Sequence, residues 1–352
     1  MEQFIGCDAH KKFSVFVAVN ERGYAGEAVR VAHDRQLYRE FLARLPAHSA
    51  IAVEASGSYS WLVDEMEQSG HHPKLCNPLE AKRRMGLTHK TDKLDAKGLA
   101  ILLCNGTLPE VWIPPSELRD QRELLRLRIF LVHLRTRVKN RIHGTLARHN
   151  LQVPGADLFG VGARLQLGAR LPELPTHSRE AVEQELAALD FLETQIESTE
   201  QRLETIMQVS VEADLLKTLP CVGKILSMVL MLEIGSVDRF PTAAHLASYA
   251  GLVPRVYSSG GHTRMGQVCG NMNRNLKWAF VETGSLVVIN QRGLAGTHVV
   301  RLYQRIKRAK NHQKAVVAVA RHLAEAAWWV LTKQEVYREP QSSRRALSST
   351  HG

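Results

Sequence analysis

The sequence predicts two unlike parts, an α/β domain at the amino-terminal end and a mostly helical remainder. Over residues 4–110, short apolar runs of strand length alternate with stretches of helical spacing, the pattern of an α/β sheet. Prolines at positions 109, 114 and 115 mark the end of this pattern. Beyond them, residues 117–148 and 178–208 carry apolar side chains three and four positions apart, which predicts two long helices.

The amino-terminal domain is expected to begin with strands. Apolar runs lie at 4–8, 13–19 and 50–54, and a shorter one follows at 73–76. Helical spacing covers 36–45, 59–68 and 95–103, and Ser69-Gly70 provides a stop signal for the second of these helices. Early strands followed by alternating helices and strands are typical of a ribonuclease-H-type sheet.

The two long helices differ in charge. The first is strongly basic, whereas the second is acidic and carries a coiled-coil-like apolar stripe. They could pack as an antiparallel hairpin with opposite charges facing, or form a dimer contact, and the basic helix could face nucleic acid or solvent. Between them, residues 152–175 contain several Gly and Pro and are predicted to be a loop or linker.

A third region begins near residue 211. Leu219-Pro220-Cys221-Val222-Gly223-Lys224 joins two apolar helical stretches and is similar to a helix-hairpin-helix turn, whose amides meet a phosphate. Cys221 stands where such turns usually have Gly, so a tight turn between core helices is the alternative. The predicted regions are therefore 1–112, a helical linker at 113–210, a carboxy-terminal domain at 211–336 and a disordered tail at 337–352.

Four acidic residues lie where a nuclease-type fold needs metal ligands. Asp8 and Glu54 each close an apolar strand, and Asp92 and Asp95 share one face at the start of a helix. Hard divalent cations take carboxylate oxygens, and phosphoryl chemistry often uses two such ions about 3.5–4 Å apart. The pattern predicts a site for Mg²⁺, with Mn²⁺ as an alternative, that acts on a nucleic-acid backbone.

The overall charge points the same way. The net charge is +11 at pH 7, which favours polyanionic partners. Five scattered cysteines, none in a C-x-x-C pair, indicate neither a zinc site nor a disulfide framework and are typical of a reduced, cytosolic protein. The amino terminus does not resemble a signal peptide, and the apolar stretch 315–331 is too charged for a membrane span.

Candidate nucleic-acid contacts are spread along the chain. Residues 301–314 carry six basic residues and no acid, and several arginines flank a Ser-Ser-Gly-Gly segment at 258–261. Taken alone, that segment is more often a flexible turn than a nucleophile. The candidate contacts are Lys90, Arg126, Arg135, Lys139, Gly223, Arg255, Arg264 and Arg274.

Five motifs occur together and in order. They are Gly6-x-Asp8, Glu54-Ala55-Ser56-Gly57-x-Tyr59, Lys90-Thr91-Asp92-x-x-Asp95-Ala96, Leu219-Pro220-x-Val222-Gly223, and Ala250-Gly251-Leu252-x-Pro254 followed by Ser259-Gly260. With these motifs the chain resembles the DEDD transposases of the insertion-sequence "one-hundred-ten" family and its "eleven-eleven" subgroup. The resemblance spans residue 4 to about residue 335.

The resemblance implies a RuvC-like domain in which Asp8, Glu54, Asp92 and Asp95 bind metal, and a carboxy-terminal domain in which Ser259 is the nucleophile. The adjacent Ser258 leaves open which hydroxyl attacks. The resemblance also implies an RNA-guided recombinase of the bacterial cytoplasm and nucleoid, in which an element-encoded guide RNA pairs with donor and target DNA and dimers form a tetramer. Two alternatives remain: a junction-resolving nuclease that uses water, and a non-enzymatic nucleic-acid-binding protein.

Overall fold

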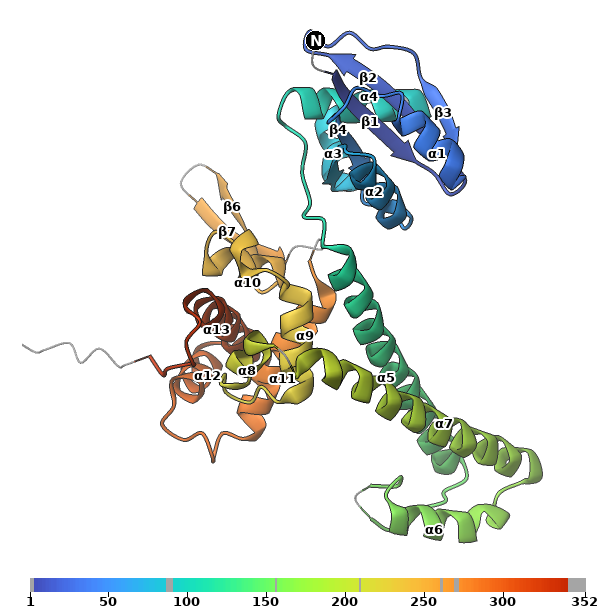
Figure 1. The fold of residues 1–352 in the computed structure, drawn as a ribbon. Helices are drawn as coiled ribbons and strands as arrows, with labels where there is room; N and C mark the ends of the chain where they lie inside the picture. The colour runs from blue at the N-terminus through green and yellow to red at the C-terminus, as the bar shows by residue number, and fades with distance from the viewer. Residues whose placement is uncertain are drawn as a thin grey trace, which may run out of the picture. The chain divides into compact units, whose positions relative to one another are not determined.

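The computed structural model describes residues 3–86, 91–155, 157–208, 210–259, 262–268 and 272–340. The chain divides into two compact units, Met1–Glu117 and Leu118–Gly352, shown in Figure 1 and described here one at a time. The regions predicted at 113–210 and 211–336 therefore lie almost entirely within one unit. Buried Leu125 and Leu203 of the long helices belong to the same hydrophobic core as the carboxy-terminal helices.

The amino-terminal unit is built on a five-stranded sheet with the order β3-β2-β1-β4-β5. Strand β2 pairs antiparallel with both β1 and β3, whereas β4 pairs in parallel with both β1 and β5. The mixed sheet confirms the predicted α/β class. The strands are β1 (Gln3–Ala9), β2 (Phe13–Asn20), β3 (Val29–Ala32), β4 (Ala50–Glu54) and β5 (His72–Cys76).

Helices cover both faces of this sheet. One face packs on α1 (Arg35–Leu42) and α2 (Tyr59–Gln68), and the other packs on α4 (Asp92–Cys104), with α3 (Pro78–Met85) beside it. Cys7 belongs to the first face, so Gly6 and Asp8 point to the α4 face, because successive strand residues alternate. By the same alternation, buried Val53 lies on the first face and Glu54 on the α4 face.

Helix α4 crosses β1 at very close range. A Cβ atom at Gly6 would lie 1.9 Å from the Ala96 carbonyl oxygen and 2.7 Å from the Ala100 amide nitrogen. Only glycine allows this approach. The contact fixes the height of α4 on the sheet, and with it the position of the acidic first turn of the helix.

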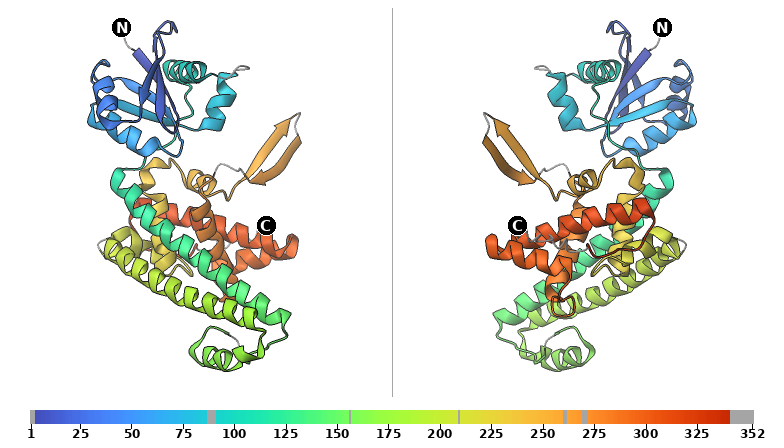
Figure 2. Two further views of the ribbon diagram at one scale, coloured as in Figure 1. Left: turned by 90° about the vertical axis from the view of Figure 1, so that its right-hand side faces the viewer. Right: turned by 90° about the vertical axis from the view of Figure 1, so that its left-hand side faces the viewer.

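The long helices α5 (Ser116–Arg148) and α7 (Thr176–Met207) form an antiparallel hairpin, visible from two sides in Figure 2. The ion pairs run in opposite directions along the two helices: Arg128 with Glu200, Lys139 with Glu193, and Arg141 with Glu185. Of the two arrangements that the sequence left open, the structure contains the intramolecular hairpin with opposite charges facing.

At the tip of this hairpin, the structure differs from the predicted loop. Residues 152–175 were expected to be a loop, but they contain the helix α6 (Val161–Arg170) and the short helix η1 (Leu171–Glu173). Leu167 is fully buried, and Arg164 pairs with Asp190 of α7. These tertiary contacts outweigh the low helix propensity of Gly162 and Gly168 within α6.

The carboxy-terminal part is mostly helical, as predicted, and carries one two-stranded sheet. Helix α13 packs against α10, α11 and α12, and its buried positions include Val319, Leu323 and Ala327. The elements are α8 (Val211–Lys217), α9 (Lys224–Ile234), η2 (Val237–Arg239), α10 (Ala243–Tyr249), β6 (Pro254–Ser259), β7 (His262–Val268), α11 (Arg274–Ile289), α12 (His298–Ala309) and α13 (His312–Lys333).

Two further features bear on the predictions for this region. In the turn before α9, Cys221 has a φ of 60°, the left-handed conformation that glycine adopts at lower cost. Of the predicted tail, residues 337–340 are described: the Tyr337 amide donates to Thr218 Oγ1, and Glu339 accepts from the His298 amide. The remainder, 341–352, lies outside the described residues. Among the described helices, none is long and apolar enough to cross a membrane.

Candidate functional site

The predicted metal ligands gather on the α4 face of the sheet. Asp8 lies near the end of β1, and Asp92 is the first residue of α4, where the Thr91 side chain caps the helix by accepting from the Leu94 amide at 3.3 Å. His10 lies between the two acids: its Nε2 atom is 3.1 Å from Asp8 Oδ2 and 3.3 Å from Asp92 Oδ2. One ligand atom from each residue falls within 4.8 Å of the others, a spacing suited to one metal ion.

The other two acids lie close to this group. Asp95 is one helical turn beyond Asp92. Glu54 follows Val53, which is the partner of Cys7 in the parallel register, so Glu54 and Asp8 occupy neighbouring strand ends. The structure thus places Asp8 and Glu54 on the sheet face that α4 covers, and Asp92 and Asp95 in the first turn of α4. Their role as metal ligands stays a prediction.

The electrostatics of Asp8 reflect this crowding of negative charge. Burial raises the pKa of the Asp8 carboxyl, the His10 imidazole lowers it, and the charges of Asp95 and Asp92 raise it again; the net direction is upward. A carboxylate surrounded by other carboxylates is destabilised as an anion. A divalent cation bound among these groups relieves that repulsion, so the donor set fits such an ion.

His10 is a site residue that sequence reasoning missed. Its ring stacks on Phe13, with centroids 4.6 Å apart, and this contact directs Nε2 toward the acids. That nitrogen is buried and has no hydrogen-bond partner among the described residues, although two carboxylates lie at ion-pair distance. The signal was present in the sequence, because Gly6, Asp8 and His10 follow the two-residue period of one strand face.

The predicted nucleophile lies in the carboxy-terminal unit. Ser259 ends β6 opposite His262 of β7, and Ser258 is opposite Thr263. The structure describes the backbone of both serines. Gly260, Lys90 and the side chain of Arg255, all named in the predictions, lie outside the described residues.

The other basic candidates fall into two groups. Arg126 and Lys139 are engaged: Arg126 donates to both carboxylate oxygens of Glu233, and Lys139 pairs with Glu193 at 3.5 Å. Arg126 therefore has an intramolecular partner, although its side chain is 49% exposed, and its contact with nucleic acid stays a prediction. Arg264, Arg274 and Gly223, the N-cap residue of α9, are exposed, and Arg135 is half-buried. Their contacts with nucleic acid stay predictions.

Glu233 is the centre of a buried polar network. Its carboxylate is fully buried and also accepts from Asn273 Nδ2 at 2.7 Å and Asn275 Nδ2 at 2.8 Å, while Arg122 donates to the Leu232 and Glu233 carbonyls. Burial alone would raise the pKa of Glu233, but the hydrogen bonds from Arg126 and the two asparagines outweigh it and lower that pKa. Asn273 also caps α11, the helix that follows the β6–β7 hairpin.

Comparison with known families accounts for this arrangement. A family model described as "Transposase", of the DEDD type of IS110, matches residues 5–151, which include the four acids. A second model, "Transposase IS116/IS110/IS902 family", matches residues 213–298, which include the β6–β7 hairpin. The chain belongs to the IS110 family of transposases. It is therefore a DNA-processing enzyme of an insertion sequence, and its DEDD-type domain implies a divalent metal.

Full-length relatives support the assignment. The transposase is 25% identical to the transposase of insertion sequence IS1328 from Yersinia enterocolitica, over 95% of this chain and 98% of the relative. It is 23% identical to the IS1111A transposase of Coxiella burnetii, over 96% and 91% respectively. It is also 25% identical to a pilin gene-inverting protein of Moraxella lacunata, over 82% of this chain and 81% of the relative.

Proposed function

We propose that this transposase is an RNA-guided recombinase that cleaves DNA through a phosphoserine formed at Ser259, with a divalent metal held by Asp8, Glu54, Asp92 and Asp95. The observation that carries the metal-dependent part is the meeting of Asp8, His10 and Asp92 around one point. The serine chemistry, the guide RNA and the tetramer are supported by the family resemblance. The net charge of +11 supports polyanionic partners.

The amino-terminal site supplies charge and orientation. When bound, a divalent ion polarises the scissile phosphate and stabilises the charge that develops on it. Asp8 and Asp92 would provide oxygen ligands that lie within 4.8 Å of each other, and Glu54 and Asp95 would add the remaining negative charge. His10 adds a nitrogen donor whose direction is fixed by its stacking on Phe13. Mg²⁺ is the proposed ion, and Mn²⁺ is the alternative.

The proposed cleavage is a balanced exchange of one ester for another. The Ser259 hydroxyl oxygen forms a bond to phosphorus, the bond from phosphorus to the 3′ oxygen breaks, the hydroxyl proton passes to a base, and the 3′ oxygen takes up a proton. After strand exchange, a 3′-hydroxyl attacks the phosphoserine and restores Ser259. The phosphoester bond is conserved throughout, so no ATP is needed. The pilin gene-inverting relative supports this scheme, because an inversion rejoins the ends that it cuts.

The deciding experiment detects the covalent intermediate. The transposase is incubated with cognate guide RNA, labelled DNA and Mg²⁺, and the products are separated under denaturing conditions. Wild type is expected to give a covalent protein–DNA adduct that Ser259→Ala does not form. Ser258→Ala is the matched control and is expected to retain it.

Other outcomes discriminate between the remaining functions. An undiminished adduct with Ser259→Ala removes this serine from the role. Cleavage without any adduct indicates a nuclease that uses water, and tight DNA binding without metal-dependent cleavage indicates a binding protein. Loss of wild-type adduct after removal of the RNA is expected if the protein is RNA-guided.

A further inference from the structure

A large cleft lies beside the β6–β7 hairpin within the carboxy-terminal unit. Its volume is about 1160 Å³, and its walls come from the hairpin, from the end of α12 and from the first turns of α13. The metal site and the proposed serine chemistry do not use it. The lining residues are Leu252, Pro254, Tyr257, Arg264, Gly266, Ile306, Lys310, Gln313, Lys314, Val317 and Ala318.

The charged side chains of this cleft are all cationic. Arg264, Lys310 and Lys314 are exposed, no acid is among the described residues that line the cleft, and none of the three forms an ion pair with another described residue. The long helix α13 also begins here, with Asn311 as its N-cap, so the positive end of its dipole adds to the field of the lysines. The cleft therefore favours phosphate groups.

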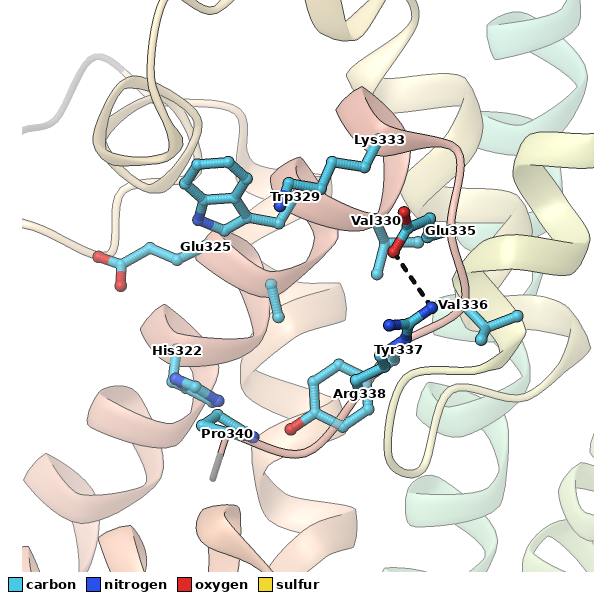
Figure 3. A pocket seen from close by; sticks show the side chains of 11 residues that line it. His322, Glu325, Trp329, Val330, Lys333, Glu335, Val336, Tyr337, Arg338 and Pro340 are labelled. Carbon is cyan, nitrogen blue, oxygen red and sulfur yellow. Dashed lines mark ion pairs between the residues drawn. The ribbon is translucent and has the colours of Figure 1, made fainter. Parts of the chain in front are cut away.

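A second hollow of the same unit provides a contrast. Figure 3 shows it between α13 and residues 335–340, with a volume of about 470 Å³. Its two basic residues, Lys333 and Arg338, are balanced by Glu325 and Glu335, and Arg338 pairs with Glu335 at 3.5 Å. A hollow with balanced charge has no preference for a polyanion. The cationic lining therefore distinguishes the first cleft from the second hollow.

The cleft also offers an aromatic face. Tyr257 is 56% exposed and stands directly opposite Arg264 across the hairpin. Leu252, Pro254, Val317 and Ala318 supply an apolar lining. Exposed aromatic rings beside cations are the means by which proteins hold single-stranded nucleic acid, with the ring stacked on a base and the cations on the backbone.

We propose that this cleft binds a single-stranded segment of DNA, with at least one base against Tyr257 and the adjoining phosphates on Arg264, Lys310 and Lys314. Clefts of about 300–1,000 Å³ enclose drug-sized ligands, so a cleft of about 1160 Å³ has room for one to a few nucleotides. Tyr257 lies two residues before Ser259 on β6. A strand held here is therefore delivered to the segment that carries the proposed nucleophile.

This inference deepens the proposed function, but its test does not depend on cleavage. Binding is measured in full-length protein carrying Ser259→Ala, by fluorescence anisotropy with a labelled 20-nucleotide oligo-dT, an oligo-U of equal length and a duplex. Failure of the serine chemistry leaves these measurements intact, and failure of the cleft leaves the adduct assay intact.

Three variants of this background separate the contributions. Lys310→Gln with Lys314→Gln is expected to weaken oligo-dT binding at least tenfold and to reduce the slope of log affinity against log salt by about 1.4, since each single-strand phosphate contact contributes roughly 0.7. Tyr257→Ala is expected to weaken binding about tenfold with the salt slope unchanged, because stacking of a base on the ring involves no phosphate contact. Tyr257→Phe is expected to bind as the parent does.

The matched control removes two charges from the second hollow, by Lys333→Gln with Arg338→Gln, and is expected to leave affinity and salt slope unchanged. A direct measurement accompanies it: an oligo-dT with 5-iododeoxyuridine is photocrosslinked, and the adduct is expected on the peptide that contains Tyr257. The proposal is overturned if the cleft double variant binds within twofold of its parent, if oligo-U or duplex binds more tightly than oligo-dT, or if the crosslinks all map elsewhere.

Discussion

Two acidic residues of this transposase, Asp8 and Glu233, have opposite surroundings. The comparison distinguishes a carboxylate that stabilises the fold from one that is available to a ligand. Glu233 is enclosed by donors, namely Arg126, Asn273 and Asn275, and its pKa is lowered. Asp8 is surrounded by other acids and one imidazole, and its pKa is raised. The first carboxylate is satisfied by the protein itself. The second is in surroundings that a cation would improve.

The difference between the surroundings of Asp8 and Glu233 does not arise because they belong to different units. Glu65 lies in the same unit as Asp8, is fully buried, and is held by Arg39 and Arg35, which lower its pKa. Glu65 therefore resembles Glu233 rather than its neighbour Asp8. A buried acid with donor partners stabilises the fold, whereas a cluster of acids without such partners is a candidate site for chemistry.

The largest expected effect comes from removing one acid of the cluster. Asp8→Asn is expected to lower the metal-dependent cleavage rate about a thousandfold, because a bound ion contributes several kcal/mol to the transition state and about 4 kcal/mol corresponds to that factor. The temperature of thermal unfolding without metal is expected to be unchanged or slightly higher, because the variant has less repulsion among the clustered carboxylates. A variant that unfolds several degrees earlier contradicts the comparison.

Removal of the charge of Glu233 is expected to lower the stability of the fold, whereas removal of the charge of Asp8 is expected to lower the cleavage rate. Glu233→Gln removes the buried anion beside half-exposed Arg126 and beside buried Arg122, whose Nε lies 3.9 Å from Glu233 Oε2, and breaking a buried pair costs at most about 3–5 kcal/mol of folding free energy. Denaturant unfolding at pH 7 measures the loss. A destabilisation below about 1 kcal/mol would show that the network contributes little.

The pH dependence of the free-energy difference between wild type and Glu233→Gln tests whether the difference comes from the charge of Glu233. The folded pKa of Glu233 lies below its unfolded value of about 4.3. The stabilisation from the ionised group is therefore complete above about pH 5 and is lost as the pH falls through the folded pKa. The free-energy difference between wild type and Glu233→Gln is expected to shrink over this acidic range, and a constant difference would assign it to packing.

A smaller effect is expected where α4 meets the sheet. Gly6→Ala places a Cβ atom against the Ala96 carbonyl, so α4 must shift outward, and overpacking of this kind costs about 1–3 kcal/mol. The shift also moves Asp92 and Asp95 away from Asp8, so weaker Mn²⁺ binding is expected in titration calorimetry. Gly57→Ala is a matched control, because a Cβ atom there has nothing within 4 Å.

The smallest effect concerns His10. Imidazole is a better ligand for Mn²⁺ than for Mg²⁺, whose preferred donors are oxygens. His10→Gln replaces the nitrogen donor with an amide and is expected to weaken Mn²⁺ binding at least about tenfold, since even residues that only support a metal ligand contribute about 10–100-fold, with a smaller change for Mg²⁺. Electron paramagnetic resonance of Mn²⁺, with Mg²⁺ as competitor, measures the ratio of the affinities for the two ions. An unchanged ratio excludes direct coordination by His10.

The sequence predicted the parts of the site that depend on local pattern. Strand ends located Asp8 and Glu54, and helical spacing located Asp92 and Asp95. Glu233 was missed because its partner Arg126 lies 107 residues away. The edge strand β3 has four residues, too few for a periodic signal, and α6 was taken for a loop because its glycines hide a helix that tertiary contacts stabilise.

The contact between Gly6 and α4 has a consequence for changes in chain length. The backbone of α4 is anchored at Ala96, one turn after Asp92, so the two positions are joined by a segment of fixed pitch. One residue inserted between them would rotate Asp92 by about 100° around the helix axis and out of the site. Deletions there would do the same in the other direction. Residues 21–28 between β2 and β3 are all exposed, so length variants of this transposase are expected to be tolerated better there than within this one turn of α4.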